Sequence, residues 1–300
     1  MKKELTCEPF YETEATSGLD DYKIKKQTYY GPEFRFQVRD VLVDTQTGIV
    51  FIDHLSPKAI LESSNILAIE VGDYIRRRRQ REVEIGIWTS LSSRSYAHWL
   101  LQDFPGFIRY MELNREAKVA IASKPPSYVN DSLKLLEITP SKKSEILRAE
   151  YFEFIGAQYA VALPSLRDLK TLKDFQQERI KTVEGERIPS KIYISRRKSN
   201  RPLKDEILVH DIMTSKGFAI VYLEDMDWES QIQLFSNAEF IIGTHGAGLA
   251  NIVWCQNSPK VIEIYDPNFQ QESLMMLGKK LNISYSRITA DEFLKSNWSV

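Results

Sequence analysis

Hydrophobic and polar positions follow two different periods along this chain of 300 residues. Between Phe34 and Val38 apolar side chains occupy every second position, and the apolar runs 41–43 and 49–52 flank a polar turn at 44–48. A period of two around a central turn is typical of a β-hairpin. We therefore predict a β-rich lead-in at the N-terminal end of the chain.

Beyond this lead-in, segments with apolar residues at helical spacing alternate with short apolar runs. The predicted strands cover residues 84–90, 119–122, 159–163, 191–195, 218–222, 240–243 and 261–265. The predicted helices cover residues 96–115, 131–136, 144–154, 165–183, 205–216 and 228–237. Strands and helices in alternation are typical of a parallel, doubly wound sheet, so the predicted fold class is α/β.

The polar stretch 185–189 interrupts this alternation and marks a predicted junction between domains. We predict one Rossmann-like domain over 1–184 and a second over 185–300, with a central cleft between them. The C-terminal helix is expected to be able to pack back on the first domain. Ligands of such sheets bind beyond the carboxyl ends of the strands, so candidate site residues are expected there.

Charge and composition narrow the class of protein. The net charge is −1, so the chain lacks the basic excess of proteins that bind nucleic acid. Residues 76–81 hold five arginines, which is typical of a solvated loop; an anionic lipid or an acidic substrate is the alternative partner. Two cysteines, Cys7 and Cys255, favour a reducing compartment. Without an apolar leader or a membrane-length apolar run, a cytoplasmic location is expected.

The segment 240–251 carries the most information about function. An apolar strand runs into a turn made of His245, Gly246, Ala247 and Gly248. A helix that begins in such a turn attracts an anion, the two glycines permit close approach of a phosphate, and the histidine can add a hydrogen bond. The alternative is a strand–turn–helix crossover whose glycines serve packing.

Two neighbouring strands end in charged residues. Arg196 and Arg197 follow the strand predicted at 191–195, and a planar guanidinium matches phosphate oxygens. Glu263 lies in the strand predicted at 261–265, where a carboxylate can accept ribose hydroxyls. The alternatives are a solvated basic turn and an ordinary polar strand residue. Together these residues favour a nucleotide diphosphate ligand.

A histidine and an aspartate lie at a second strand-to-helix junction. His98, Gln102 and Asp103 are spaced to share one helical face after the strand predicted at 84–90. Such a pair can act as a general base and its orienting partner. The alternative is a core histidine with a satisfied hydrogen bond.

Metal and cofactor motifs are weak in this sequence. Asp225 and Asp227 match a D-x-D pattern of metal–diphosphate sites, but Asp227 is predicted to cap the helix that starts at Trp228. No His or Cys cluster has zinc spacing, and neither a Walker lysine motif nor G-x-G-x-x-G occurs. No metal is therefore predicted.

Several of these blocks, in this order, resemble glycosyltransferase family 61 over residues 35–285. Gly106 departs from the pattern, since the family often has arginine after this proline. The blocks that carry the resemblance are 40–43, 61–63, 98–105, 192–197, 231–238, 243–251 and 261–263.

The resemblance implies a GT-B fold, a nucleotide-sugar donor that is usually a UDP-sugar, and inversion at the anomeric carbon. It implies a glycan or lipid-linked glycan as acceptor, no further cofactor, and a role of the bacterial type in capsule or other surface polysaccharide synthesis. Such an enzyme is expected in the cytoplasm, with peripheral contact to the inner face of the membrane.

Residue by residue, the resemblance implies that Arg196 and Arg197 hold the diphosphate. The turn 245–248 would complete that pocket, Glu263 would hold the ribose, and Asp103 or His98 would deprotonate the acceptor hydroxyl. A nucleotide-sugar epimerase of the same layout and a catalytically silent module that binds glycan or nucleotide are the alternatives.

Overall fold

The computed structural model of the protein divides into two compact units, Met1–Asp168 and Leu169–Val300. The division falls in helix α5 (Leu166–Arg179), whereas the sequence places the junction after residue 184, and that domain assignment stays a prediction. The structure describes residues 95–113, 125–139, 163–181, 187–199, 203, 206–267 and 271–296, and the strand backbone at 6–9, 19–20, 23–24, 34–44, 50–52, 58–61, 83–89, 118–120 and 146–155.

The described strands of the first unit form a mixed sheet with the order β6-β5-β4-β9-β7-β8, and β1 pairs with β4. The pairs β7–β8 and β7–β9 are parallel and the others are antiparallel. The predicted hairpin is confirmed, because β4 and β5 pair antiparallel with Val41 opposite Ile52. The strands are β1 Thr6–Pro9, β4 Phe34–Asp44, β5 Val50–Ile52, β6 Lys58–Leu61, β7 Val83–Thr89, β8 Lys118–Ala120 and β9 Ile146–Ile155, beside a separate ribbon of β2 Leu19–Asp20 and β3 Lys23–Ile24.

The helix predicted over 144–154 is wrong, since strand β9 occupies Ile146–Ile155. This segment is rich in aromatic and β-branched residues, which pack well on a pleated surface. It pairs with β4 on one side and β7 on the other, so tertiary pairing overrides the apolar spacing that also fits a helix. The strand predicted at 159–163 lies almost wholly outside the described residues, as do residues 76–81.

The helices of the first unit follow the predicted pattern more closely. The helix predicted at 96–115 consists of α2 (Tyr96–His98), a π-helical turn η1 (Trp99–Asp103) and α3 (Phe104–Leu113). The helix predicted at 131–136 is part of α4 (Ser127–Leu135). In the part of the chain that the structure describes, no helix has the length and apolar character needed to cross a membrane.

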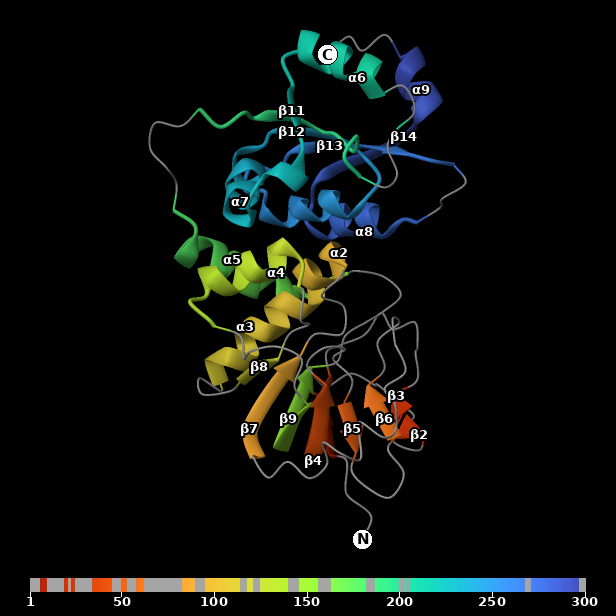
Figure 1. Ribbon diagram of the computed structural model, residues 1–300. Helices are drawn as coiled ribbons and strands as arrows, with labels where there is room; N and C mark the ends of the chain where they lie inside the picture. The colour runs from red at the N-terminus through yellow and green to blue at the C-terminus, as the bar shows by residue number, and fades with distance from the viewer. Residues whose placement is uncertain are drawn as a thin grey trace. The chain divides into compact units, whose positions relative to one another are not determined.

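The second unit contains a five-stranded parallel sheet with the order β11-β10-β12-β13-β14 (Figure 1). Counted along the chain from β10, the order is 2-1-3-4-5, as in flavodoxin-like doubly wound sheets. The predicted α/β class is thus confirmed for this unit, while the two-domain GT-B layout stays a prediction. The strands are β10 Lys191–Ile194, β11 Ala219–Val221, β12 Phe240–Thr244, β13 Lys260–Tyr265 and β14 Ser284–Thr289.

Helices cover both faces of this sheet (Figure 1). Helices α6 (Glu206–Ser215) and α9 (Ala290–Lys295) lie on one face, and α7 (Trp228–Asn237) and α8 (Ser273–Lys280) on the other. Apolar side chains fill the layer under α6 and α9, and the strand residues among them alternate with residues of the opposite face. This layer contains Tyr193, Val209, Met213, Phe218, Ile242, Ile262, Ile264 and Phe293.

Local signals set the ends of these helices. Gly217 ends α6 with φ +77°, and the N–H of Phe218 donates to the carbonyl of Met213 at 3.0 Å, which is a Schellman motif. The predicted cap of α7 is confirmed, because the N–H of Ser230 donates to Oδ1 of Asp227 at 2.7 Å.

Candidate functional site

The carboxyl ends of β10 and β12 lie side by side in the second unit. Ile194 is paired with Gly243, so the segments that start at Ser195 and His245 follow neighbouring strands. The chain goes from β10 to β11 at one side and then crosses to β12 at the other, which makes this the topological switch point of the sheet. Ligands of doubly wound sheets bind in the crevice at such a point.

Arg196 connects the two loops at this point. Its Nη1 donates to the carbonyl oxygen of His245, and its Nε donates to Oγ of Ser199 at 3.1 Å. A Cβ added to Gly246 would lie 2.7 Å from Nη1 of Arg196. The missing side chain of Gly246 therefore makes room for the Arg196 guanidinium, whereas the sequence led us to expect room for a phosphate.

Arg197 differs from its two basic neighbours. Its side chain is exposed, and within the described part of the chain its guanidinium has no hydrogen-bond or ion-pair partner. The ammonium of Lys198 instead pairs with Asp225 and lies 4.9 Å from the centre of the Tyr222 ring. Of these three cations, Arg197 is the one that is available to an anion.

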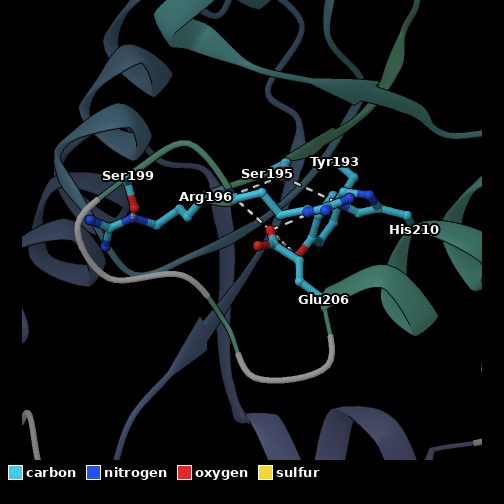
Figure 2. A network of polar contacts seen from close by, with 7 residues as sticks. Tyr193, Ser195, Arg196, Ser199, Glu206 and His210 are labelled. Carbon is cyan, nitrogen blue, oxygen red and sulfur yellow. Dashed lines mark hydrogen bonds and ion pairs between the residues drawn. The ribbon is translucent and has the colours of Figure 1, made fainter.

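A buried network fixes the backbone of this basic loop (Figure 2). The carboxylate of Glu206, 3% exposed, accepts hydrogen bonds from the N–H of Arg196 at 2.8 Å and from the hydroxyl of Tyr193 at 3.1 Å. Nε2 of His210 lies 3.1 Å from Oγ of Ser195 and 3.8 Å from Glu206 Oε1. Burial, and then the Glu206 charge, raise the pKa of Tyr193, which keeps its hydroxyl a donor.

The sequence analysis missed Glu206 and His210. A usable signal was present, because the two residues are four apart and lie in the helix that follows the basic loop. What the sequence did not contain was the contact between the Glu206 carboxylate and the N–H of Arg196.

His245 is held by both its backbone and its ring. Its N–H donates to the carbonyl of Ile264 at 2.7 Å, and its Nδ1 is hydrogen-bonded to Oε1 of Glu263. Glu263 is fully buried, and its Oε2 accepts from the hydroxyl of Tyr285 at 2.9 Å and lies 3.2 Å from Nε of Arg287. A contact of this carboxylate with a ribose hydroxyl stays a prediction.

The segment after His245 forms a 3-10 helix, η3 (Ala247–Trp254). A Cβ added to Gly248 would lie 2.8 Å from Cδ1 of Leu223, so a larger residue here would require the Leu223 side chain to shift. The backbone of Gly248 accepts from Nδ2 of Asn251 at 3.2 Å. A contact of Ala247 or Gly248 with a diphosphate stays a prediction.

The candidate base lies in the first unit, at a π-helical turn. The N–H of Phe104 donates to the carbonyl of Trp99, five residues earlier, in place of the usual four. Nδ1 of His98 is 2.6 Å from Oε1 of Gln102, so these residues share the predicted face. Single π-helical turns frequently occur at functional sites because they realign side chains that an α-helix would separate.

Asp103 ends this turn with only 8% of its surface exposed. Burial, and then the negative charge of Asp103, raise the pKa of Tyr128. The ring of Tyr128 packs edge-on against Tyr96, with 5.0 Å between ring centres. Asp103 is therefore a largely buried acidic side chain close to Tyr128, which suits either a general base or a structural carboxylate.

The D-x-D pattern has a structural explanation. Asp225 pairs with Lys198, and Asp227 caps α7. Among the residues that the structure describes, no group of three or more His, Cys, Asp or Glu side chains could hold a metal ion.

A family model described as Glycosyltransferase 61 matches residues 96–262, which is more than half of the chain. The chain belongs to the glycosyltransferase 61 family. It is therefore a glycosyltransferase, and the matched region of this family member includes the π-helical turn, the basic loop after β10 and the turn at His245. A search among curated proteins found no match.

Proposed function

We propose that this glycosyltransferase moves a sugar from a UDP-sugar to a hydroxyl of a glycan or lipid-linked glycan, with inversion and in a GT-B layout. The observation that carries the proposal is the hydrogen bond from Arg196 to the His245 carbonyl, which we call the Arg196 clasp, at the switch point of the parallel sheet. The exposed Arg197 follows Arg196 in the same loop. Cationic and hydrogen-bonding groups at a switch point favour a diphosphate ligand.

The reaction requires one bond to form and one to break. A lone pair of the acceptor oxygen forms a bond to the anomeric carbon, while the bond from that carbon to the diphosphate oxygen breaks and its electron pair stays on that oxygen. The acceptor proton passes to a general base, for which Asp103 and His98 are the candidates. The negative charge on the leaving diphosphate is stabilised by Arg197 and by groups of the His245 turn.

The two arginines have different roles in this proposal. Arg197 contacts the diphosphate, because its guanidinium is exposed at the edge of the site. Arg196 positions the loop, because it is already bonded to His245 and Ser199. Arg197→Ala should raise the Kd for UDP roughly 10- to 100-fold, the effect of a lost charged hydrogen bond. Arg187→Ala is the matched control, since Arg187 is an exposed arginine that precedes β10.

The base is tested by separating binding from turnover. Asp103→Asn should bind UDP with wild-type affinity yet lose about 100-fold or more in kcat, because the amide cannot accept the acceptor proton. The parallel variant His98→Gln keeps a hydrogen-bonding side chain opposite Gln102. Wild-type turnover in Asp103→Asn would assign the role to His98; wild-type turnover in both variants would remove both residues from the mechanism.

Cations on the leaving group can replace a metal ion, so we propose metal-independent transfer. The decisive experiment is calorimetric titration with UDP, GDP, CDP and dTDP, with and without EDTA. Binding of one diphosphate in EDTA supports the donor site and names the donor class. Binding without transfer to any acceptor would favour a silent module, and conversion of the sugar without release of free diphosphate would favour an epimerase.

The family resemblance also supports a role in capsule or surface polysaccharide synthesis at the cytoplasmic face of the membrane. The arginine-rich stretch 76–81 is a candidate for contact with anionic lipid there. Sedimentation with anionic liposomes at low salt tests this contact, and a chain that stays in the supernatant would argue against it.

A further inference from the structure

Two backbone N–H groups of the basic loop after β10 already have partners within the protein. The N–H of Arg196 donates to Oε1 of Glu206 at 2.8 Å (Figure 2). The N–H of Arg197 donates to Oγ of Ser195 at 3.3 Å, and this Oγ also lies 3.1 Å from Nε2 of His210, one turn after Glu206 in α6. Free N–H groups of a loop can bind an anion, whereas these two are occupied. We therefore expect a diphosphate at this loop to be recognised by side chains.

Glu206 places a buried negative charge beside this loop, where the proposed ligand is itself an anion. The residue is the first of α6, and only 3% of it is exposed. Its Oε1 accepts from both the N–H of Arg196 and the hydroxyl of Tyr193, whereas Oε2 is buried without a hydrogen-bond partner in the described part of the chain. A charge in the protein interior is screened less than one in water, so this carboxylate should repel a nearby diphosphate.

Substitution by glutamine separates the geometry of this carboxylate from its charge. A glutamine at position 206 would keep Oε1 as the acceptor for Arg196 and Tyr193. Its NH2 group would take the place of Oε2, where the described residues form no hydrogen bond that could be lost. Alanine removes both the acceptor and the charge. The change from Glu to Gln therefore reports the charge, and the change from Gln to Ala reports the hydrogen bonds.

We propose that Glu206 is a positioning residue that acts on the bound diphosphate in two opposite ways. Its Oε1 holds the backbone of the basic loop, so that the exposed Arg197 guanidinium is presented to the diphosphate. Its charge at the same time weakens the binding of that anion, which favours release of the nucleotide diphosphate after transfer. This inference rests on the proposed function, because it assigns a role to the same donor site.

Calorimetric titrations with inorganic pyrophosphate and UDP test both effects. With an effective dielectric constant of about 20 and a separation of roughly 10 Å, removal of one charge should make Glu206→Gln bind both probes roughly tenfold more tightly than the wild type. Glu224→Gln is the matched control, since Glu224 is an exposed acid in the turn η2 (Leu223–Asp225) after β11, and its affinity should not change. A Glu206→Gln protein that binds no more tightly than the wild type would overturn the role of the charge.

The positioning role is measured by the difference between Glu206→Ala and Glu206→Gln. We expect the alanine variant to bind both probes roughly tenfold or more weakly than the glutamine variant. In an Arg197→Ala background this difference should disappear, because the loop acts on the diphosphate through Arg197. Equal affinities of the alanine and glutamine variants, or a difference that persists without Arg197, would overturn the positioning role.

Amide hydrogen exchange decides whether Glu206 holds the loop without any ligand, even if Glu206→Ala fails to fold. We expect the N–H of Arg196 to be protected from exchange in the wild type and in Glu206→Gln, because both keep the acceptor oxygen. Rapid exchange of this N–H in the folded wild-type protein would overturn the positioning role. If no protein binds pyrophosphate or UDP, the donor site of the proposed function fails, and the exchange of the Arg196 N–H still decides whether Glu206 holds the loop.

Discussion

Replacing Gly246 by alanine tests the Arg196 clasp with a single methyl group. Gly246 has φ 167° and ψ 170°, an extended conformation that alanine also adopts, so the backbone itself is not strained. The added Cβ would lie 2.7 Å from Nη1 and 3.0 Å from Cζ of Arg196, whereas ordinary contacts begin at 3.4 Å. The guanidinium must therefore shift by 0.7 Å (3.4 minus 2.7), and we expect this shift to weaken its bond to the His245 carbonyl.

The expected loss follows from the bond that is weakened. A hydrogen bond from a charged donor contributes about 1.5–3 kcal/mol, so the Kd for UDP should rise by up to roughly 100-fold if this bond holds the site together. Stability should fall by less, about 1 kcal/mol, because a flexible arginine can swing toward solvent. Calorimetric titration measures the first quantity and urea unfolding measures the second.

Gly217→Ala is the matched control for this substitution. Gly217 has φ +77° and no atom within 4 Å of an added Cβ, so alanine there costs about 1 kcal/mol of stability through its backbone and leaves UDP affinity unchanged. In an Arg196→Ala background, Gly246→Ala should have no further effect on affinity. The clasp would be refuted if Gly246→Ala bound UDP with wild-type affinity. It would also be refuted if Gly246→Ala caused the same loss of UDP affinity in the Arg196→Ala background.

Two further predictions concern groups outside the site. Burial raises the pKa of Cys255 to about 12. In a Cys7→Ser variant, where Cys255 is the remaining cysteine, its thiol should therefore react with a disulfide reagent at pH 8 roughly 1,000-fold more slowly than an ordinary thiol does. A thiol reaction rate that levels off near pH 9 would contradict the raised pKa. Because the pKa of Cys255 is higher in the folded protein than in the unfolded chain, the folded state should lose stability as the pH rises above the ordinary thiol range, where only the unfolded chain ionises. Asp227→Ala should lower the free energy of unfolding in urea by about 1 kcal/mol, whereas Asp227→Asn should lower it little, because asparagine also caps helices. Both variants should retain sugar transfer. A loss of transfer in both would indicate that Asp227 is a metal ligand instead.

The sequence predicted much of the second unit because its signals are local. The apolar runs of β10, β12 and β13 are short and bounded by polar residues, and Gly217 and Asp227 mark the helix ends within one turn. The turn at His245 and the basic loop were likewise visible as strand ends. Strand β9 was misread, because its apolar spacing fits both a helix and a strand, and only pairing with β4 and β7 decides between them.

The contacts within the candidate site were decided by the tertiary structure. By sequence alone Arg196 and Arg197 are equivalent, and the fold separates them by placing a carbonyl 49 residues away beside Arg196. A ribose contact of Glu263 stays a prediction, whereas its neighbours His245, Tyr285 and Arg287 follow from the order of strands in the sheet. The physical reason is that strand and helix periods depend on near neighbours in the chain, whereas the partner of a buried charge depends on which strands become adjacent.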